Sequence, residues 1–126
     1  MAVCVQDLLA SANQSVPRIT PEEARRLIEQ DGALLLDVRD SAELAQSGKL
    51  AGAINVARGM LEFRADAASA YHDAAFRAER TVIVYCASGG RSALSCKTLQ
   101  DMGYAQVFNL GGYKDAADGG FPTEAP

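Results

Sequence analysis

Apolar runs and amphipathic segments alternate along the chain. Strand-like runs lie at 33–38, 52–56, 81–85 and 106–110, and helix-like segments lie at 20–31, 41–47, 60–77 and 90–102. Asp66 is a point in the third helical segment where a second helix could begin. A run such as "ALLLDV" is typical of a strand buried on both faces of a parallel sheet. The alternation predicts an α/β fold, with a mainly parallel sheet flanked by helices on both faces.

The first strong helical segment has a clear beginning and end. Thr20 and Glu23 form a capping box, and Pro21 occupies the first helical position. Gly32 is the signal for the end of the helix. The residues before it are predicted to form one short helix that Pro17 ends. The sequence therefore predicts an N-terminal extension, 1–17, and one folded domain, 18–126.

Composition and charge limit the function classes. A length of 126 residues favours one domain with its own core. The net charge of −4 argues against nucleic acid as the main partner, because phosphate binding needs a basic face. No stretch approaches the roughly 18 apolar residues of a membrane span, so no membrane partner is predicted. Three cysteines at these spacings match neither a disulfide framework nor a zinc site, which favours a reducing, cytoplasmic location and no metal or other cofactor.

The segment "TVIVYCASGGRSALSCKTL" joins a strand to a helix through a cysteine and a small-residue loop. After Cys86, the residues Ala87, Ser88, Gly89 and Gly90 let the backbone N–H groups turn inward as an anion-binding nest. The positive end of the following helix adds to this cradle. A thiol over the cradle should have a lowered pKa and act as a nucleophilic thiolate. The alternative is a small core cysteine at the end of a strand.

The other cysteines, the histidine and a second glycine pair give weaker signals. Cys96 lies on the apolar stripe of a helix and is interpreted as an inert buried thiol, and Cys4 lies in the extension. His72 lies in a separate segment, so a surface or half-buried histidine is favoured over a cysteine–histidine pair. The glycines at 111–112 are interpreted as a turn.

Four segments in order resemble signatures of the rhodanese family of sulfurtransferases: "LLLDVRDSAEL", "GKLAGAINV", "VYCASGGRSA" and "NLGGYKDA". The resemblance covers about residues 18–123 and implies a rhodanese-like fold with a five-stranded, mainly parallel sheet. It also implies that catalytic Cys86 opens a six-residue loop ending at Arg91. In the implied reaction, the thiolate takes a sulfane sulfur from a small anionic donor such as thiosulfate, becomes a persulfide and passes the sulfur to cyanide or a thiol.

The resemblance extends to residues around the loop. Asp37 and Arg39 match the family segment near the floor of the active site, where structural ion pairing is expected. A dianionic donor would gain from a fixed cation, for which Arg91 and Arg58 are candidates. The alternative for each is a surface arginine or a salt bridge. Three positions depart from the family pattern, since Lys49 replaces a histidine, Ala51 a proline and Ala116 a tryptophan.

Other functions compete with a free-standing sulfurtransferase. Related phosphatases and arsenate reductases use a similar loop that is one residue longer, so the shorter loop from Cys86 to Arg91 favours sulfur over phosphoryl transfer. Non-enzymatic members of the family usually lack the cysteine. A persulfide carrier for a protein partner would need the same residues as the enzyme, and the sequence leaves that alternative open.

Overall fold

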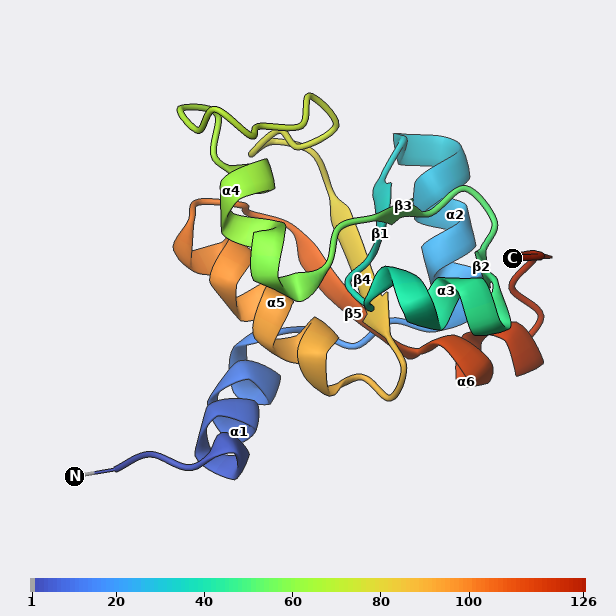
Figure 1. Ribbon diagram of the computed structural model, residues 1–126, viewed down its shortest axis with the longest axis horizontal. Helices are drawn as coiled ribbons and strands as arrows, with labels where there is room; N and C mark the ends of the chain where they lie inside the picture. The colour runs from blue at the N-terminus through green and yellow to red at the C-terminus, as the bar shows by residue number, and fades with distance from the viewer. Residues whose placement is uncertain (1) are drawn as a thin grey trace.

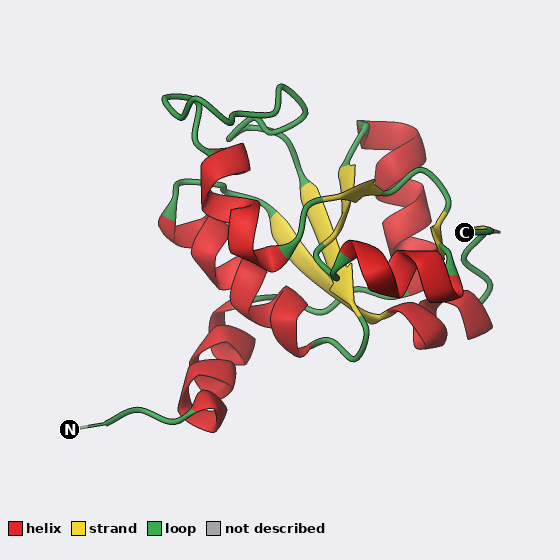
Figure 2. Cartoon of the chain, in the orientation of Figure 1, coloured by secondary structure: helices red, strands yellow, loops and turns green. Residues whose placement is uncertain are grey.

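The chain folds into a parallel sheet with helices on both faces (Figure 1). The computed structural model describes residues 2–126. The helices are α1 (Val5–Ser15), α2 (Pro21–Asp31), α3 (Ser41–Ser47), α4 (Leu61–Ala65), α5 (Gly90–Asp101) and α6 (Tyr113–Asp118), with a 3₁₀ turn, η1, at Arg58–Met60. The strands are β1 (Leu34–Asp37), β2 (Lys49–Leu50), β3 (Ile54–Asn55), β4 (Val82–Cys86), β5 (Val107–Gly112) and β6 (Thr123–Glu124). Figure 2 shows the strands of the parallel sheet at the centre, with helices to either side.

The parallel sheet has the strand order β3-β1-β4-β5. Every residue of the two central strands, β1 and β4, is buried. This burial follows from helices on both faces, which leave no solvent-facing side. The α/β fold with a mainly parallel sheet is thereby confirmed. β2 and β6 form a separate antiparallel pair.

The fifth strand implied by the family resemblance is reduced to a single bridge in the part of the chain that the structure describes. Arg18 pairs in parallel with Asn109 of β5. Asn109 N donates to Pro17 O (2.9 Å), and Ile19 N donates to Asn109 O (3.2 Å). Only three residues separate the caps of α1 and α2, and Pro17 has no N–H to donate. The segment therefore lies along the sheet edge without becoming a full strand.

Two hydrophobic clusters fill the spaces on either side of the sheet. Side chains alternate along a strand, so Leu34 and Leu36 of β1 enter one cluster and Leu35 enters the other. Residues of α4 and α5 close the first cluster, and residues of α2 and α6 close the second (Figure 1). Cys86 belongs to the first cluster, so its strand is anchored in the core.

The capping signals of α2 act as the sequence predicts. Thr20 Oγ1 accepts a hydrogen bond from Glu23 N (3.1 Å), and Glu23 Oε1 accepts one from Thr20 N (3.1 Å). Gly32 ends the helix in the left-handed conformation, with a φ of 67°.

The short helix expected in the N-terminal extension is α1. It packs along α5, where Ala12 is buried and Val16 joins the cluster on that face. Gln100 Nε2 of α5 donates to Ser15 O (2.9 Å). Neither α1 nor any other helix within residues 2–126 has the length and apolar character needed to cross a membrane.

The helix expected over 60–77 is wrong in its second half. α4 ends at Ala65, and residues 66–81 run as turns. Asp66 Oδ1 accepts from Ala68 N, and Asp73 Oδ1 accepts from Ala75 N, each over 2.9 Å. Local side-chain bonds of this kind compete with helical hydrogen bonds. The aspartates therefore form turns where the apolar spacing alone indicates a helix.

Candidate active site

Glycine shapes the loop between β4 and α5. β4 ends at Cys86, and α5 begins at Gly90. Gly89 has a φ of 100°, and a Cβ at this position would lie 3.3 Å from Gly111 Cα. A side chain at Gly89 is thus unfavourable because of both its backbone conformation and its close neighbour.

The Cys86 thiol accepts hydrogen bonds from the backbone of its own loop and of the first turn of α5. Gly89 N lies 3.1 Å and Ser92 N lies 3.4 Å from Sγ. Burial raises the pKa of the Cys86 thiol, but hydrogen bonds from the Ser92 hydroxyl and from the N–H groups of Ser92, Ser88 and Gly89 outweigh it, so the pKa is lowered. A lowered pKa increases the share of the nucleophilic thiolate at neutral pH.

A buried polar network behind the thiol is not apparent from the sequence. Ser92 Oγ lies 3.4 Å from Cys86 Sγ and donates to Asn109 Oδ1 over 2.7 Å. Asn109 also accepts from Gly111 N (2.9 Å) and donates to Gly89 O (3.1 Å). Ser92 and Asn109 are both buried. The one sequence signal for this network is a polar asparagine inside the apolar run "QVFNL".

The glycines at 111–112 do more than turn the chain. A β-bulge between Val84 and Tyr85 sets Gly112 opposite Cys86. A Cβ on Gly112 would lie 2.6 Å from Ala87 O and 3.3 Å from the Ser88 Cα. The end of β5 therefore packs directly against the loop, which the interpretation as a turn missed.

Arg91, in the first turn of α5, pairs with Glu43 of α3. Its Nη1 and Nη2 donate to Glu43 Oε2 and Oε1 over 2.8 and 2.9 Å. The side chains are 37% and 33% exposed. These bonds lower the pKa of Glu43 to about 2 and raise the pKa of Arg91. Arg91 thus forms the salt bridge that was the alternative to donor binding, and its contact with a donor stays a prediction.

Asp37 and Arg39 form a buried ion pair, as the family resemblance implies. Arg39 Nη2 lies 2.8 Å from Asp37 Oδ2, and the two side chains are nearly inaccessible. The Arg39 guanidinium lies over the rings of Tyr113 (4.5 Å to the centroid) and Tyr85 (5.6 Å). Arg39 also donates to Gly48 O (2.8 Å), which ties the end of α3 to β1.

Arg58 lies apart from the loop. Its guanidinium donates to Glu62 Oε1 and to Thr98 Oγ1, each over 3.0 Å. Thr98 is eight residues into α5 from Gly90, about 12 Å along a helix. The structure does not bring Arg58 to Cys86, so its role in donor binding also stays a prediction.

The three departures from the family pattern have structural partners of their own. Lys49 Nζ donates to Ala53 O (2.7 Å). Ala51 N donates to Pro122 O (2.8 Å). Ala116 is buried in the cluster beneath α2 and α6. None of these three contacts involves the Cys86 loop.

The remaining cysteines and the histidine lie where the sequence predicts residues without a role in the site. Cys96 is buried, and burial raises its pKa. Cys4 is exposed at the start of α1. His72 Nε2 lies 3.2 Å from Phe76 O in the segment of turns. Within residues 2–126, no cluster of histidine, cysteine and carboxylate side chains could hold a metal ion.

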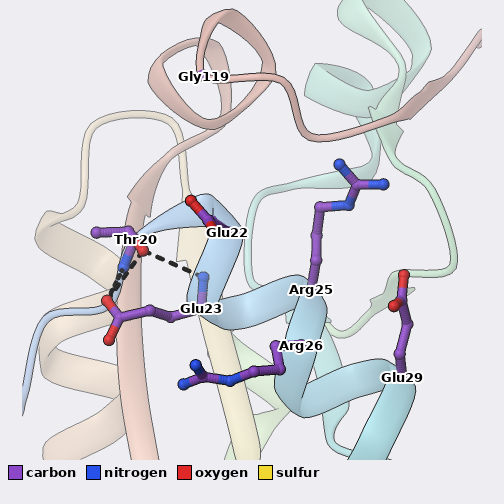
Figure 3. A pocket seen from close by; sticks show the side chains of 7 residues that line it. All are labelled: Thr20, Glu22, Glu23, Arg25, Arg26, Glu29 and Gly119. Atoms are coloured by element: carbon purple, nitrogen blue, oxygen red, sulfur yellow. Dashed lines mark hydrogen bonds between the residues drawn. The ribbon is translucent and has the colours of Figure 1, made fainter.

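Two surface cavities differ in their relation to the loop. A depression of about 250 Å³ adjoins it, lined by Glu43 and Ser47 of α3, Ala87 of the loop, and Tyr113 and Lys114 of α6, among others. A larger cavity of about 730 Å³ lies on the outer side of α2 (Figure 3). Its arginine and glutamate side chains point in different directions, and none of its lining residues belongs to the loop. We therefore assign the candidate site to the smaller depression.

Comparison with known proteins identifies the family. The model of the rhodanese-like domain matches residues 20–118, which include the Cys86 loop, Glu43 and Asn109. A sulfurtransferase from Allochromatium vinosum is 34% identical over 104 residues, covering 82% of this chain and 89% of that protein.

Two solved structures extend the likeness over nearly the whole chain. A Rhodopseudomonas palustris protein, described as of unknown function and a possible tyrosine phosphatase, shares 35% identity with a TM-score of 0.89 and covers 98% of this chain and 96% of its own. The polysulfide-sulfur transferase homodimer of Wolinella succinogenes shares 28% identity with a TM-score of 0.75, over 94% of this chain and 85% of its own. With most of its length matched by the domain model and by a sulfurtransferase, this chain belongs to the rhodanese-like family.

Proposed function

We propose that this protein transfers sulfane sulfur through a persulfide on Cys86. The donor is thiosulfate or a related persulfide, and the acceptor is cyanide or a thiol. The backbone of Ala87, Ser88, Gly89 and Gly90 binds the anionic groups. The observation that carries the proposal is the Cys86 sulfur within hydrogen-bonding distance of Gly89 N and Ser92 N, since these donors favour a charged sulfur.

The reaction balances with the residues of the loop alone. The Cys86 thiolate attacks the outer sulfur of thiosulfate, an S–S bond forms, the S–S bond of thiosulfate breaks, and sulfite leaves with the electron pair. The persulfide anion then occupies the same cradle. A nucleophilic acceptor takes the terminal sulfur, and the electron pair of the broken bond returns to Cys86 as thiolate.

Substitution of each cysteine tests the proposal. Cys86→Ser should abolish thiosulfate:cyanide sulfur transfer. Mass spectrometry of the wild type after thiosulfate treatment should show the gain of one sulfur atom on Cys86. Cys4→Ser and Cys96→Ala are the controls and should retain most of the activity, because Cys4 is exposed just before α1 and Cys96 is buried in the core. Sulfur transfer that survives in Cys86→Ser would refute the proposal.

A cysteine phosphatase or arsenate reductase is the second candidate, favoured by the description of the Rhodopseudomonas relative. Two features weigh against it. Only four residues separate Cys86 from Arg91, and the Arg91 guanidinium is directed to Glu43. Turnover of p-nitrophenyl phosphate or arsenate that depends on Cys86 and exceeds sulfur transfer would favour this candidate.

A role as a persulfide carrier has its own structural support. Val5 and Leu8 of α1 are exposed, and the neighbouring Leu9 side chain reaches the start of α5 at Gly90. A protein acceptor could contact this apolar surface close to the loop. Transfer from Cys86 persulfide to a protein thiol much faster than to cyanide would favour the carrier. We also propose a cytoplasmic location, because the three cysteines match no disulfide framework.

A further inference from the structure

The arginine best placed to attract an anionic donor is already neutralised. Both Arg91 terminal nitrogens are engaged by the two Glu43 oxygens, at 2.8 and 2.9 Å. A two-point pair of this geometry fixes the guanidinium in place and cancels its charge at a distance. Glu43 is also a lining residue of the depression beside Ala87, so an approaching donor meets the carboxylate that compensates the arginine.

The other cations near the depression have carboxylate partners too. Arg39 pairs with Asp37 in the interior. Lys114 Nζ lies 2.9 Å from Asp118 Oδ2 on the exposed side of α6. Each positive charge along this depression is therefore matched by a negative one. Such a surface gives little attraction to a dianion, because Coulomb attraction grows with the product of the charges.

We propose that Glu43 is a specificity-determining residue that compensates the positive charge of Arg91 and thereby sets the site for monoanionic sulfane-sulfur donors over dianionic ones. Perthiolates and organic thiosulfonates belong to the monoanionic class, and thiosulfate to the dianionic class. This inference rests on the proposed sulfur transfer through Cys86. It assigns to α3 a role in donor choice that the Cys86 loop alone does not provide.

Two donors that differ in one charge allow a direct test. Thiosulfate is a dianion and releases sulfite. Methanethiosulfonate is a monoanion and releases methanesulfinate when the Cys86 thiolate takes its outer sulfur. The bond that breaks and the persulfide that forms are the same in both reactions. A difference between the donors therefore reports mainly on their charge.

The decisive variant is Glu43→Gln, which removes the negative charge of this side chain. Its amide oxygen can still accept the hydrogen bond that Asp40 N donates to Glu43 Oε2 in the wild type (2.9 Å). We expect kcat/KM for thiosulfate to rise about tenfold and for methanethiosulfonate only about threefold, because the interaction energy is proportional to donor charge. The thiosulfate rate of the variant should also fall more steeply with added salt than that of the wild type.

Two further variants separate charge from structure. Asp101→Asn changes the net charge equally by releasing Lys97 at the far end of α5, and it should leave the donor ratio unchanged. Glu43→Gln combined with Arg91→Gln restores a neutral pair and should return the ratio toward the wild-type value. Equal changes for both donors, or a shift in Asp101→Asn as large as in Glu43→Gln, would overturn the inference. If neither donor loads Cys86 in the wild type, the proposed sulfur transfer is overturned instead.

Discussion

A single hydroxyl proton connects the Cys86 sulfur to Asn109. Ser92 Oγ lies 2.7 Å from Asn109 Oδ1, which can only accept, so the Ser92 proton points to Asn109 while a protonated thiol donates to Ser92. When the thiol ionises, the Ser92 proton can turn to the sulfur, because Asn109 Oδ1 keeps its bond from Gly111 N. We infer that the network satisfies its buried polar atoms in both states, which favours ionisation inside a buried site.

This proton switch predicts the titration of Cys86. The wild-type thiol should titrate below a free cysteine, and Ser92→Ala should raise its pKa, because one hydrogen bond to the charged form is lost while the amide donors remain. The measurement is the pH dependence of iodoacetamide alkylation, resolved by residue with mass spectrometry. Ser95→Ala is the matched control, since the buried Ser95 hydroxyl on the same helix donates to Arg91 O. Equal shifts in the two variants would contradict the switch.

At the level of secondary-structure elements, close approach of β5 to the loop fixes the shape of the cradle. The bulge in the β4–β5 pairing shifts the register so that glycine, and no larger residue, faces the strand end at Cys86. Backbone atoms of Ala87 and Ser88 then occupy the space of a side chain at Gly112. Backbone cannot move aside as a flexible side chain can, so this contact is rigid.

Gly112→Ala should therefore destabilise the fold by about 2 kcal/mol, as overpacking commonly does, and should also reduce the rate of Cys86 alkylation at neutral pH by displacing the loop. Urea unfolding followed by circular dichroism measures the first effect. Gly59→Ala is the control, because a Cβ at Gly59 meets open space, and its stability should stay within about 0.5 kcal/mol of the wild type. A Gly112→Ala protein as stable as Gly59→Ala would show that the loop moves to make room for the added methyl group and that the contact is not rigid.

The elements with local causes are those that the sequence predicts well. The α2 cap depends on neighbours in the chain, and the central strands depend on apolar runs, so both follow from short segments. The β2–β6 pair joins Lys49 to Glu124, which lie far apart in the sequence. No local sequence pattern predicts this pairing. The turns at Asp66 and Asp73 arise because side-chain bonds outcompete the helix that apolar spacing favours.

The candidate site likewise has a part that follows from a local motif and a part that depends on contacts between distant residues. Cys86 and its glycines form one continuous motif, and the motif indicates a cradle from sequence alone. Glu43 is 48 residues from Arg91, and Asn109 is 17 residues from Ser92. These partners come together only through the order of strands in the sheet. The sequence thus indicates Cys86 as the candidate nucleophile but does not indicate Glu43 and Asn109, which lie around it in the structure.

For the molecule as a whole, the ion pair between Arg91 and Glu43 connects α3 to the start of α5, directly after the Cys86 loop. It joins residues far apart in the sequence, whereas the partners in the pairs of Lys97, Arg58 and Lys114 are each four residues apart. Local pairs of that kind stabilise a helix turn by tenths of a kcal/mol. The pair of Arg91 and Glu43 should matter more, because breaking it frees two elements of the site.

The pH dependence of stability should therefore carry the signature of Glu43. Its pKa is lowered from 4.5 to about 2, chiefly by the hydrogen bonds from Arg91. A carboxyl with a lowered pKa stabilises the fold fully above its unfolded pKa, and that contribution is lost as the pH falls from about 5 toward 2. Since both side chains are about one-third exposed, solvent screening limits this contribution to about 1 kcal/mol.

Glu43→Gln should be less stable than the wild type by that amount at pH 7, and the difference should shrink toward zero near pH 2. Urea unfolding at a series of pH values measures it, with Glu62→Gln, which breaks the exposed pair with Arg58, as the control. A stability difference for Glu43→Gln that stays constant from pH 7 to pH 2 would mean that the charge of Glu43 contributes nothing and that only its shape holds the loop.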